Sequence, residues 1–351
     1  MKNGKLQAAI LGCGNIGNNH AQAILNNPDL MEISAVCDKI PEKAELYQNK
    51  YHAKRVYTDM EDLLSDPTID MVSICTPSGY HAEHAAACAA HGKNILCEKP
   101  LDITREKIQN MIECFQGSGL KAGAVFQYRT YPGIQRAKEL IQSGSLGKVL
   151  VANACYQQYR SPEYYRSAGW RGTWEIDGGG STMNQGIHIM DILCYLTGGA
   201  KSILAKAPTL SRAIEVEDVS CAVITFCSGA VGTYQATTLA NPPLTIRADI
   251  LCENGRICFC DPETILYTPE HPEGISLGKG APGFENSGQS SLDPGNGGHT
   301  FLIRNLAKAI LGEDEVFIPL EEGCHAVDVI LSLYQSSKSG REIQIPQRSS
   351  L

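Results

Sequence analysis

Three observations predict an α/β protein with two domains of different texture. The first third of the 351 residues alternates short apolar runs with helical patterns, which indicates parallel strands connected by helices. Glycines stand between the first apolar run and the first helical pattern, the usual place for a phosphate-binding turn. From about residue 125, apolar runs are joined by Ser-Gly and Asn-Gly turns, which is typical of antiparallel strands. We therefore predict a doubly wound parallel sheet in residues 1–124 and a second α/β domain in residues 125–351.

The elements of each domain follow from these patterns. In the first domain the expected strands lie in 6–11, 31–38, 69–77, 93–100 and 121–128, and the expected helices lie in 18–27, 43–51, 79–92 and 103–119. In the second, a helix over 133–144 precedes strands in 147–159, 220–239, 244–260 and 264–268, and helices over 300–312 and 320–340 follow. Residues 269–299 are rich in Gly, Pro and Ser without periodicity, so we expect a long loop there, for instance a lid. His299 could reach the site from such a lid, or it could equally cap the helix that follows.

Composition excludes several classes of protein. The net charge of -8 and the absence of a Lys/Arg-rich block argue against a nucleic-acid partner. No apolar run approaches the length of a membrane span, and the N-terminus lacks a cleavage site for a signal peptide, so we expect a cytoplasmic protein. The 14 cysteines lie mostly inside apolar runs and form no Cys-x-x-Cys pair, which favours reduced core thiols and no metal site.

A cofactor site is predicted by Gly12-x-Gly14-x-x-Gly17, which opens the first helix. Glycines permit a tight turn and close approach of the backbone to a pyrophosphate, whose charge the helix N-terminus favours. Asp38 ends the next strand, where a carboxylate accepts the ribose hydroxyls and repels a 2′-phosphate. The pattern predicts a Rossmann domain that binds NAD in preference to NADP.

Catalytic candidates come from two segments. The strand before Glu98 and Lys99 delivers both to the carboxyl edge of the sheet, where open α/β sheets bind ligands, and Pro100 restricts the backbone of Lys99. In residues 177–196, Asn184 and His188 are spaced i and i+4, followed by Asp191, so a helix would place all three on one face. A histidine with polar neighbours on its face is a candidate general base.

These residues carry a family resemblance. GCGNIG, Asp38, EKP at 98–100 and GGGSTMNQGIHIMD at 178–191 together resemble the glucose-fructose oxidoreductase / inositol dehydrogenase / rhizopine-catabolism (Gfo/Idh/MocA) family, nearest in motif to its pyranoside 3-dehydrogenase branch, which includes UDP-N-acetylglucosaminuronate 3-dehydrogenases. The resemblance implies a Rossmann domain followed by an α/β domain with a large, open, mostly antiparallel sheet, through which a homodimer or homotetramer would form. Much of the family has an aspartate where this chain has Asn184.

The resemblance also implies roles for single residues. Lys99 and His188 would be catalytic, with Lys99 on the substrate hydroxyl and His188 as the base. Expected cofactor contacts are Gly12, Gly14, Asn15, Ile16, Gly17, Asp38, Thr76, Pro77, His81, Glu98, Lys99, Trp170 and Arg171; expected substrate contacts are Gln127, Tyr156, Arg160, Asn184 and His188.

The predicted activity is hydride transfer between nicotinamide and a ring hydroxyl of a sugar or sugar derivative, with C3 as the expected carbon. The tyrosines, tryptophans and arginines of residues 156–180 suit such a substrate. Three alternatives stay open: transient 3-oxidation of a glycoside followed by elimination, an inositol dehydrogenase, and a non-enzymatic NAD-binding sensor.

Overall fold

The chain forms two compact units in the computed structural model, which describes residues 4–244, 246–281 and 297–347. The first unit is the described part of Met1–Val125 and Asn296–Cys324, and the second is that of Phe126–Gly295 and His325–Leu351. The predicted boundary after residue 124 lies one residue from this division. The prediction that everything after it belongs to the second domain needs correction, because residues 297–324 pack with the first unit.

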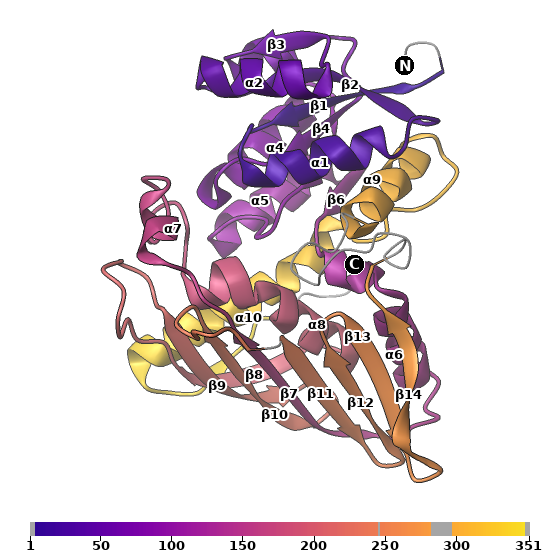
Figure 1. Ribbon diagram of the computed structural model, residues 1–351, viewed down its shortest axis with the longest axis vertical. Coiled ribbons are helices and arrows are strands. Elements are labelled where there is room, and N and C mark those ends of the chain that lie inside the picture. Colours follow the sequence, from indigo (N-terminus) through magenta and orange to yellow (C-terminus); the bar gives the residue numbers. More distant parts are fainter. Residues whose placement is uncertain (1–3, 245, 282–296, 348–351) are drawn as a thin grey trace. The chain divides into compact units, whose positions relative to one another are not determined.

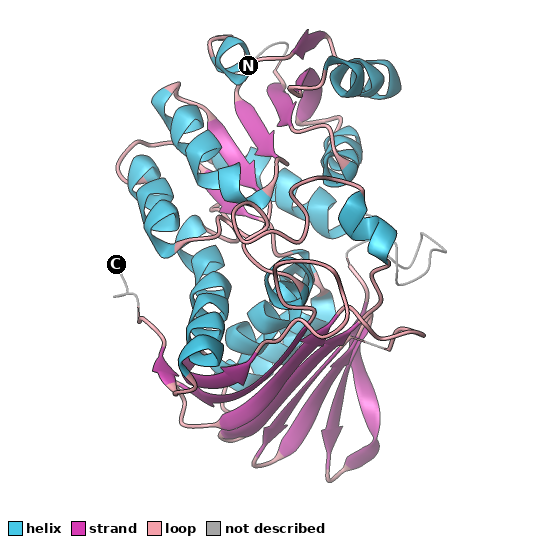
Figure 2. Ribbon diagram, turned by 90° about the vertical axis from the view of Figure 1, so that its left-hand side faces the viewer, coloured by secondary structure: helices cyan, strands magenta, loops and turns pink. Residues whose placement is uncertain are grey.

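The first unit is built on a six-stranded parallel sheet in the order β3-β2-β1-β4-β5-β6, with helices on both faces (Figures 1 and 2). The central strand β1 is buried along its whole length, as its continuous apolar run predicts. The elements are β1 (Leu6–Leu11), α1 (Asn15–Leu25), β2 (Met31–Cys37), α2 (Pro41–Tyr51), β3 (Arg55–Tyr57), α3 (Met60–Leu64), β4 (Met71–Ile74), the 3₁₀ turn η1 (Ser78–Tyr80), α4 (His81–Ala90), β5 (Asn94–Cys97), α5 (Arg105–Phe115), β6 (Ala122–Ala124) and α9 (Gly297–Ile310).

Helix α9 packs against α1 and bonds to the segment that follows α1, although the two helices are far apart in the sequence. Asn27 Nδ2 donates to the Thr300 carbonyl at 3.2 Å, and Arg304 forms an ion pair with Asp29 at 2.8 Å. The long helix α10 (Leu320–Ser339) begins in this unit and ends in the second.

The second unit is built on a nine-stranded sheet in the order β14-β13-β12-β11-β7-β10-β9-β8-β15. All its strand pairs are antiparallel except β7 with β10, which confirms the predicted mostly antiparallel sheet. The elements are the 3₁₀ turn η2 (Gln127–Thr130), α6 (Pro132–Gln142), β7 (Val149–Gln157), α7 (Pro162–Arg166), the π-helical turn η3 (Ser181–Gly186), α8 (Ile187–Thr197), β8 (Ala200–Lys206), β9 (Val219–Phe226), β10 (Val231–Thr237), β11 (Arg247–Cys252), β12 (Gly255–Cys260), β13 (Glu263–Thr268), β14 (His271–Lys279) and β15 (Ile343–Gln344).

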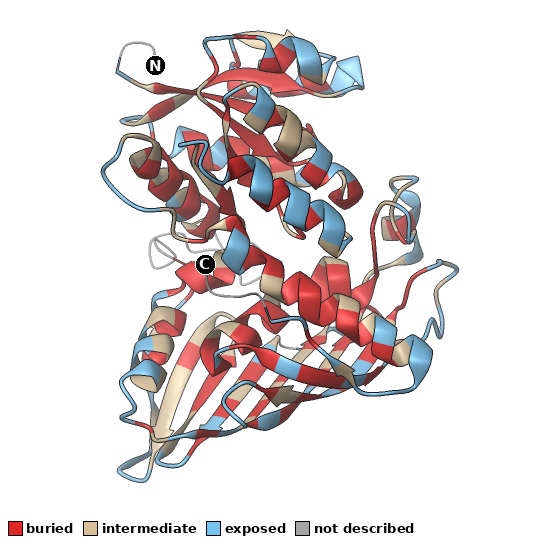
Figure 3. Ribbon diagram, turned by 180° about the vertical axis from the view of Figure 1, so that it is seen from behind, coloured by how far each residue is buried: buried red, intermediate tan, exposed pale blue. Residues whose placement is uncertain are grey.

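One face of the nine-stranded sheet is covered and the other is open. Helix α8 packs on β7 and β11, and α6 packs on β13 and β14. Figure 2 shows helices over this face, and no described helix of the second unit covers the opposite face. The strands accordingly alternate buried and exposed residues, as in β9 and β10 (Figure 3).

The predicted loop over residues 269–299 is wrong in part. Residues 271–279 form the edge strand β14, which pairs with β13 through register shifts. Gly274 and Gly278 have φ values of 89° and 151°, and such irregular positions erase the alternation that marks a strand. Residues 282–296 lie outside the described residues, and α9 already begins at Gly297.

The cysteines and the helices bear on two expectations from composition. All 14 cysteines are free thiols and most are buried, but Cys114, Cys221 and Cys227 are exposed. Among the described helices, none combines the length and hydropathy needed to cross a membrane.

Candidate active site

The turn after β1 has the shape of a dinucleotide-binding loop. Gly12 has φ of 101°, and a Cβ there would lie 2.7 Å from the backbone of Cys75, so only glycine fits beside the end of β4. A Cβ on Gly17 would lie 2.6 Å from the Gly12 carbonyl. Gly14, by contrast, has no atom within 4 Å of such a Cβ and is exposed, which leaves the approach to its backbone open for a cofactor phosphate. The residues present therefore fit a dinucleotide.

Asp38, directly after β2, holds this loop. One carboxylate oxygen accepts the Cys13 N–H at 2.9 Å, and the other accepts the Ile40 N–H at 2.9 Å. Each oxygen retains a lone pair for a ribose hydroxyl. Asn15 and Ile16 open helix α1 beside this carboxylate-supported turn.

The segments that follow β4 and β5 are joined by His81. Its side chain is buried, and its ring nitrogens lie 2.7 Å from the Pro100 carbonyl and 2.8 Å from the Thr76 carbonyl. Both nitrogens are thus used on the protein backbone, so the predicted contribution of His81 to cofactor binding would act through the positions of Thr76 and Pro100. Pro77 is half-buried in the same turn.

Glu98 follows β5 and is 3% exposed. Its Oε1 lies 3.0 Å from His20 Nε2 and 3.1 Å from His299 Nε2, and its Oε2 accepts the Lys99 N–H at 3.2 Å. Lys99 itself is half-buried and precedes Pro100 through a cis peptide bond. Sequence reasoning did not identify His20 as a site residue, and it did not predict that His299 contacts Glu98. Both histidines are so far from Glu98 in the sequence that no spacing rule predicts these contacts.

In the second unit, a π-helical turn stands where we predicted a continuous α-helix. Residues Ser181–Gly186 form η3, and α8 starts only at Ile187. The buried carboxylate of Glu217 accepts the N–H groups of Gly180 at 2.9 Å and Thr182 at 2.8 Å, which supports the start of the turn. Burial raises the pKa of Glu217, against the lowering effect of these bonds. π-Helical turns occur frequently at functional sites.

The predicted single helix through Asn184, His188 and Asp191 is wrong: Asn184 lies in η3, whereas His188 and Asp191 lie three residues apart on α8, a spacing that keeps both on one helix face. The three side chains have separate surroundings: Asn184 donates to the buried carboxylate of Asp177, and Asp191 forms a buried two-bond ion pair with Arg129 at 2.7 and 2.9 Å. Asp191 therefore has a structural partner. Asp177 is a residue that sequence reasoning did not single out.

His188 is half-buried and lies against Tyr128, with ring centroids 5.7 Å apart. The Tyr128 hydroxyl donates to Asp261 Oδ2 at 3.0 Å. Burial raises the pKa of Asp261 to about 6, although the bond from Tyr128 acts in the opposite direction. Within the described residues, Asp261 Oδ1 and Gln127 Oε1 are buried acceptors without a hydrogen-bond donor, so both suit a substrate hydroxyl.

Gln185, which the sequence did not indicate, connects the predicted substrate residues. Its Oε1 accepts the Tyr156 hydroxyl at 3.1 Å and Arg160 Nη2 at 2.7 Å, and its Nε2 donates to the Tyr164 hydroxyl at 2.9 Å. Arg160 and Arg171 lie over the Tyr164 ring, at 5.2 and 4.3 Å from its centroid. Arg171 also stacks on Trp170 at 4.7 Å. The predicted aromatic and cationic cluster is thus a single hydrogen-bonded group.

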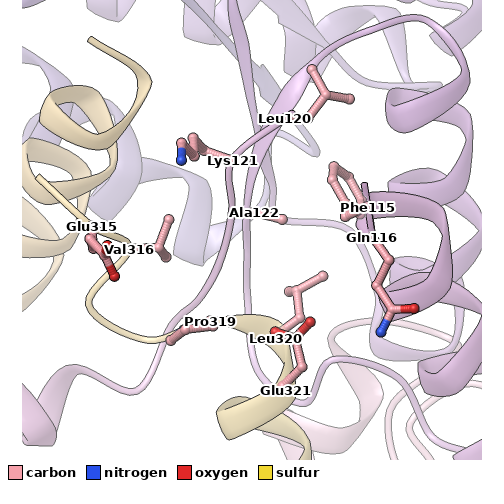
Figure 4. A pocket seen from close by; sticks show the side chains of 10 residues that line it. All are labelled: Phe115, Gln116, Leu120, Lys121, Ala122, Glu315, Val316, Pro319, Leu320 and Glu321. Carbon is pink, nitrogen blue, oxygen red and sulfur yellow. The ribbon is translucent and has the colours of Figure 1, made fainter. Parts of the chain in front are cut away.

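A separate pocket of about 300 Å³ lies on the first unit, between the end of α5, β6 and residues 315–321 (Figure 4). Three charged residues, Lys121, Glu315 and Glu321, line it together with apolar residues such as Leu320 and Val316. None of the predicted site residues lines it, so it is not part of the candidate active site.

The fold and these residues define an NAD-binding oxidoreductase. The profile of an oxidoreductase family with an NAD-binding Rossmann fold, GFO_IDH_MocA, matches residues 6–126, and the profile of the GFO/IDH/MocA C-terminal domain matches residues 134–258. Together the two matches cover well over half of the chain, which therefore belongs to the Gfo/Idh/MocA family.

Several relatives are similar over most of their length. D-glucoside 3-dehydrogenase of Escherichia coli K12 is 26% identical over 98% of this chain and 99% of its own. Levoglucosan dehydrogenase of Pseudarthrobacter phenanthrenivorans is 27% identical over 67% of this chain and 68% of its own. The WlbA dehydrogenase of Bordetella pertussis, solved in complex with NADH and UDP-GlcNAcA, is 28% identical with a TM-score of 0.88 over 99% of this chain and 100% of that one. These relatives of the chain are a sugar dehydrogenase, a glucoside dehydrogenase and a dehydrogenase that binds NADH and a sugar nucleotide, which confirms the predicted class of enzyme and cofactor.

Proposed function

We propose that this protein oxidises a ring hydroxyl, at C3, of a pyranose sugar derivative. The observation that carries the proposal is the cluster around Gln185: two cations and two tyrosines join it in one hydrogen-bonded group, and Gln127 and Asp261 of the same unit offer buried acceptors. Such a lining matches a polyhydroxylated ring, because each hydroxyl needs a fixed partner and the apolar ring face needs an aromatic wall. A 3-dehydrogenase of D-glucosides and a UDP-GlcNAcA-binding dehydrogenase among the relatives support the same substrate class.

In this mechanism Lys99 donates a hydrogen bond to the reacting hydroxyl and stabilises the alkoxide charge that develops on it. His188 accepts the hydroxyl proton as general base. Asn184 is an amide that can orient a hydroxyl but cannot exchange its proton, so His188 acts without a second base from η3. Asp38 accepts the adenosine ribose hydroxyls, and the turn at Gly14 binds the pyrophosphate. The chemistry that NAD supplies when bound is acceptance of hydride from the substrate carbon.

Arg160 selects for a negative charge on the substrate. Its Nη2 donates to Gln185, while its buried Nε has no acceptor among the described residues. A guanidinium whose Nε–H has no acceptor can still bind a carboxylate, since Arg–carboxylate pairs commonly form two parallel hydrogen bonds. We therefore expect a uronate or another acidic sugar to be preferred over neutral hexoses.

A homo-oligomer through the open sheet face is the second part of the proposal. Apolar side chains on this face are largely exposed: Val223 is 55% exposed, Val231 50% and Leu204 46%. Contiguous exposed apolar patches of this kind mark surfaces that bind another protein. Leu204 and Val223 are direct cross-strand neighbours, so they form a continuous patch. A second copy of the chain has the matching patch, which favours a symmetric pairing.

The test is a substrate panel with NAD, followed by NADH absorbance, containing UDP-N-acetylglucosaminuronate, aryl glucosides, levoglucosan, inositols and free hexoses. Turnover of an acidic or glycosidic pyranose is expected, with kcat/KM falling by roughly 10²–10⁴-fold in Lys99→Met. The matched control is Lys54→Met, which removes an exposed lysine paired with Glu32. Full activity of Lys99→Met would contradict the mechanism. Release of aglycone without net NADH would instead support transient oxidation, and turnover of inositols alone would support an inositol dehydrogenase.

A further inference from the structure

Two buried histidines and a buried glutamate contact one another inside the first unit, and the glutamate directly precedes Lys99 in the chain. His20 lies on α1, Glu98 follows β5, and His299 lies in the first turn of α9. They are 0%, 3% and 5% exposed, and both histidines direct Nε2 at the same oxygen of Glu98, at 3.0 and 3.1 Å. The residue separations from Glu98 are 78 and 201, so the chain brings them together only in the folded unit.

The geometry assigns the protons of this cluster. A carboxylate oxygen is an acceptor, so each histidine presents a protonated Nε2, and its neutral form then has an unprotonated Nδ1. His20 Nδ1 is buried without a hydrogen-bond partner among the described residues, which costs least for a nitrogen that bears no proton. Burial lowers the pKa of His20 and so favours this neutral form. Burial by itself raises the pKa of Glu98, but the two histidine bonds outweigh it and hold that pKa well below its ordinary value.

The second oxygen of Glu98 links this cluster to the catalytic segment. Oε2 accepts the backbone N–H of Lys99 at 3.2 Å, while Oε1 is occupied by the histidines. With Oε1 held from two sides, the carboxyl group cannot rotate without breaking both bonds. The peptide that joins Glu98 to Lys99 is therefore held in one orientation, and that orientation sets the direction in which the Lys99 side chain leaves the backbone.

We infer that His20 and His299 are positioning residues for the dehydrogenase reaction, acting through Glu98 to orient Lys99. The inference rests on the proposed role of Lys99 in catalysis. It gives helix α9 a part in the chemistry: its first turn supplies one of the two donors that keep the carboxylate in place. Neither histidine contacts the reacting atoms in this role, so substrate and NAD affinity should respond much less than kcat.

The same three side chains are also a possible set of metal ligands, since their ligand atoms lie within 4.8 Å of one another. The hydrogen-bonded arrangement accounts for the observed distances without an ion, because 3.0 and 3.1 Å are ordinary N–H···O separations. A chelator distinguishes the two arrangements. It should leave the activity unchanged if the three side chains are only hydrogen-bonded, and it should abolish the activity if they hold a metal ion that the enzyme needs.

The first test is Glu98→Gln in the full-length enzyme. The amide keeps the volume, but in either orientation its NH₂ group meets an N–H donor, so either the histidines or Lys99 lose their acceptor. We expect kcat to fall by roughly 10–100-fold, with the Kd for NADH, measured by fluorescence, within about threefold of wild type. In a Lys99→Met background the same substitution should change kcat by less than about threefold, because its effect passes through Lys99.

The second test uses His299→Gln and His299→Ala. The glutamine amide can still donate to Glu98 Oε1, so it should restore most of the activity that the alanine variant loses. His91→Ala is the matched control, since His91 lies at the surface of the same unit and binds Glu61. It should leave kcat unchanged.

Three results would overturn the inference. The first is a wild-type kcat in Glu98→Gln. The second is an equal fold-decrease of kcat when Glu98→Gln is introduced into wild type and into Lys99→Met, and the third is stoichiometric zinc in the purified enzyme whose removal abolishes activity. Full activity of Lys99→Met alone would refute the proposed function and the inference with it. An inactive Lys99→Met beside a fully active Glu98→Gln would refute only the inference.

Discussion

Replacing Asn184 by aspartate introduces the residue that the family resemblance led us to expect, and it brings two carboxylates together in this chain. Asn184 Nδ2 donates to Oδ1 of Asp177, whose side chain is 2% exposed. In Asn184→Asp, two carboxylates meet where an amide and a carboxylate met. At about 3 Å and an effective dielectric constant of about 20, their repulsion is about 5 kcal/mol. Taking up one proton costs about 4 kcal/mol at pH 7, because an ordinary carboxyl pKa lies about three units lower. The pair therefore binds a proton, and the free energy of unfolding falls by about 4 kcal/mol.

This loss should depend on pH with a definite sign. The folded variant binds one proton more than the unfolded chain, so the penalty is present above the ordinary carboxyl pKa and shrinks as the pH falls. At pH 5 it should be about 1.5 kcal/mol. Urea unfolding of wild type and variant at both pH values measures the difference. Asn184→Leu is the control, since it removes the donor without adding charge and should cost about 1–3 kcal/mol at either pH. An equal loss for Asn184→Asp at pH 5 and pH 7 would refute the reasoning.

Three further predictions concern the loop, a buried acid and the sheet face. Gly12→Ala should destabilise the fold by about 2 kcal/mol or more, because its Cβ would meet the Cys75 backbone at 2.7 Å at a positive φ, whereas Gly14→Ala should keep the wild-type Tm and weaken NADH binding in a fluorescence titration. Equal Tm values for the two variants would contradict this account. Burial raises the pKa of Asp261 to about 6, so wild type should lose stability as the pH rises from about 4 to 6. Asp261→Asn should remove that slope in pH-dependent thermal unfolding, and an unchanged slope would count against the assignment. Val223→Lys places a charge on the open sheet face and should reduce the mass found by light scattering to that of one chain; an unchanged mass would place any interface elsewhere.

The parts of this protein that depend on local pattern could be predicted from the sequence. Continuous apolar runs separated by helices predict the parallel sheet, and the strand before Glu98 places Lys99 at its carboxyl end. The hairpin turns predict β9–β10 and β11–β12 for the same reason, since a turn type fixes the pairing of its neighbours. Strand β14 escaped prediction because two glycines and register shifts interrupt its alternation.

The surroundings of the site residues could not be predicted, because they depend on contacts between distant segments. Glu98 and His299 are 201 residues apart, and no spacing rule connects them. Asn184 and His188 have the same i and i+4 spacing in a π-helical turn as in an α-helix, so periodicity cannot distinguish the two. Gln185 stands beside Asn184 in the sequence, yet only its four partners in space reveal that it organises the predicted substrate residues.

The return of α9 to the first unit has a consequence for how the enzyme is made. The first 125 residues contain all six strands of the parallel sheet but not α9, so Glu98 then has only one of its two histidine donors, and Asp29 has no Arg304. N-terminal domains generally fold first during synthesis. Here the segment that completes the NAD-binding unit emerges only after most of the second unit has been translated. The nascent chain is therefore prevented from finishing its nucleotide-binding unit until the part proposed to hold the substrate exists, which couples the maturation of the two.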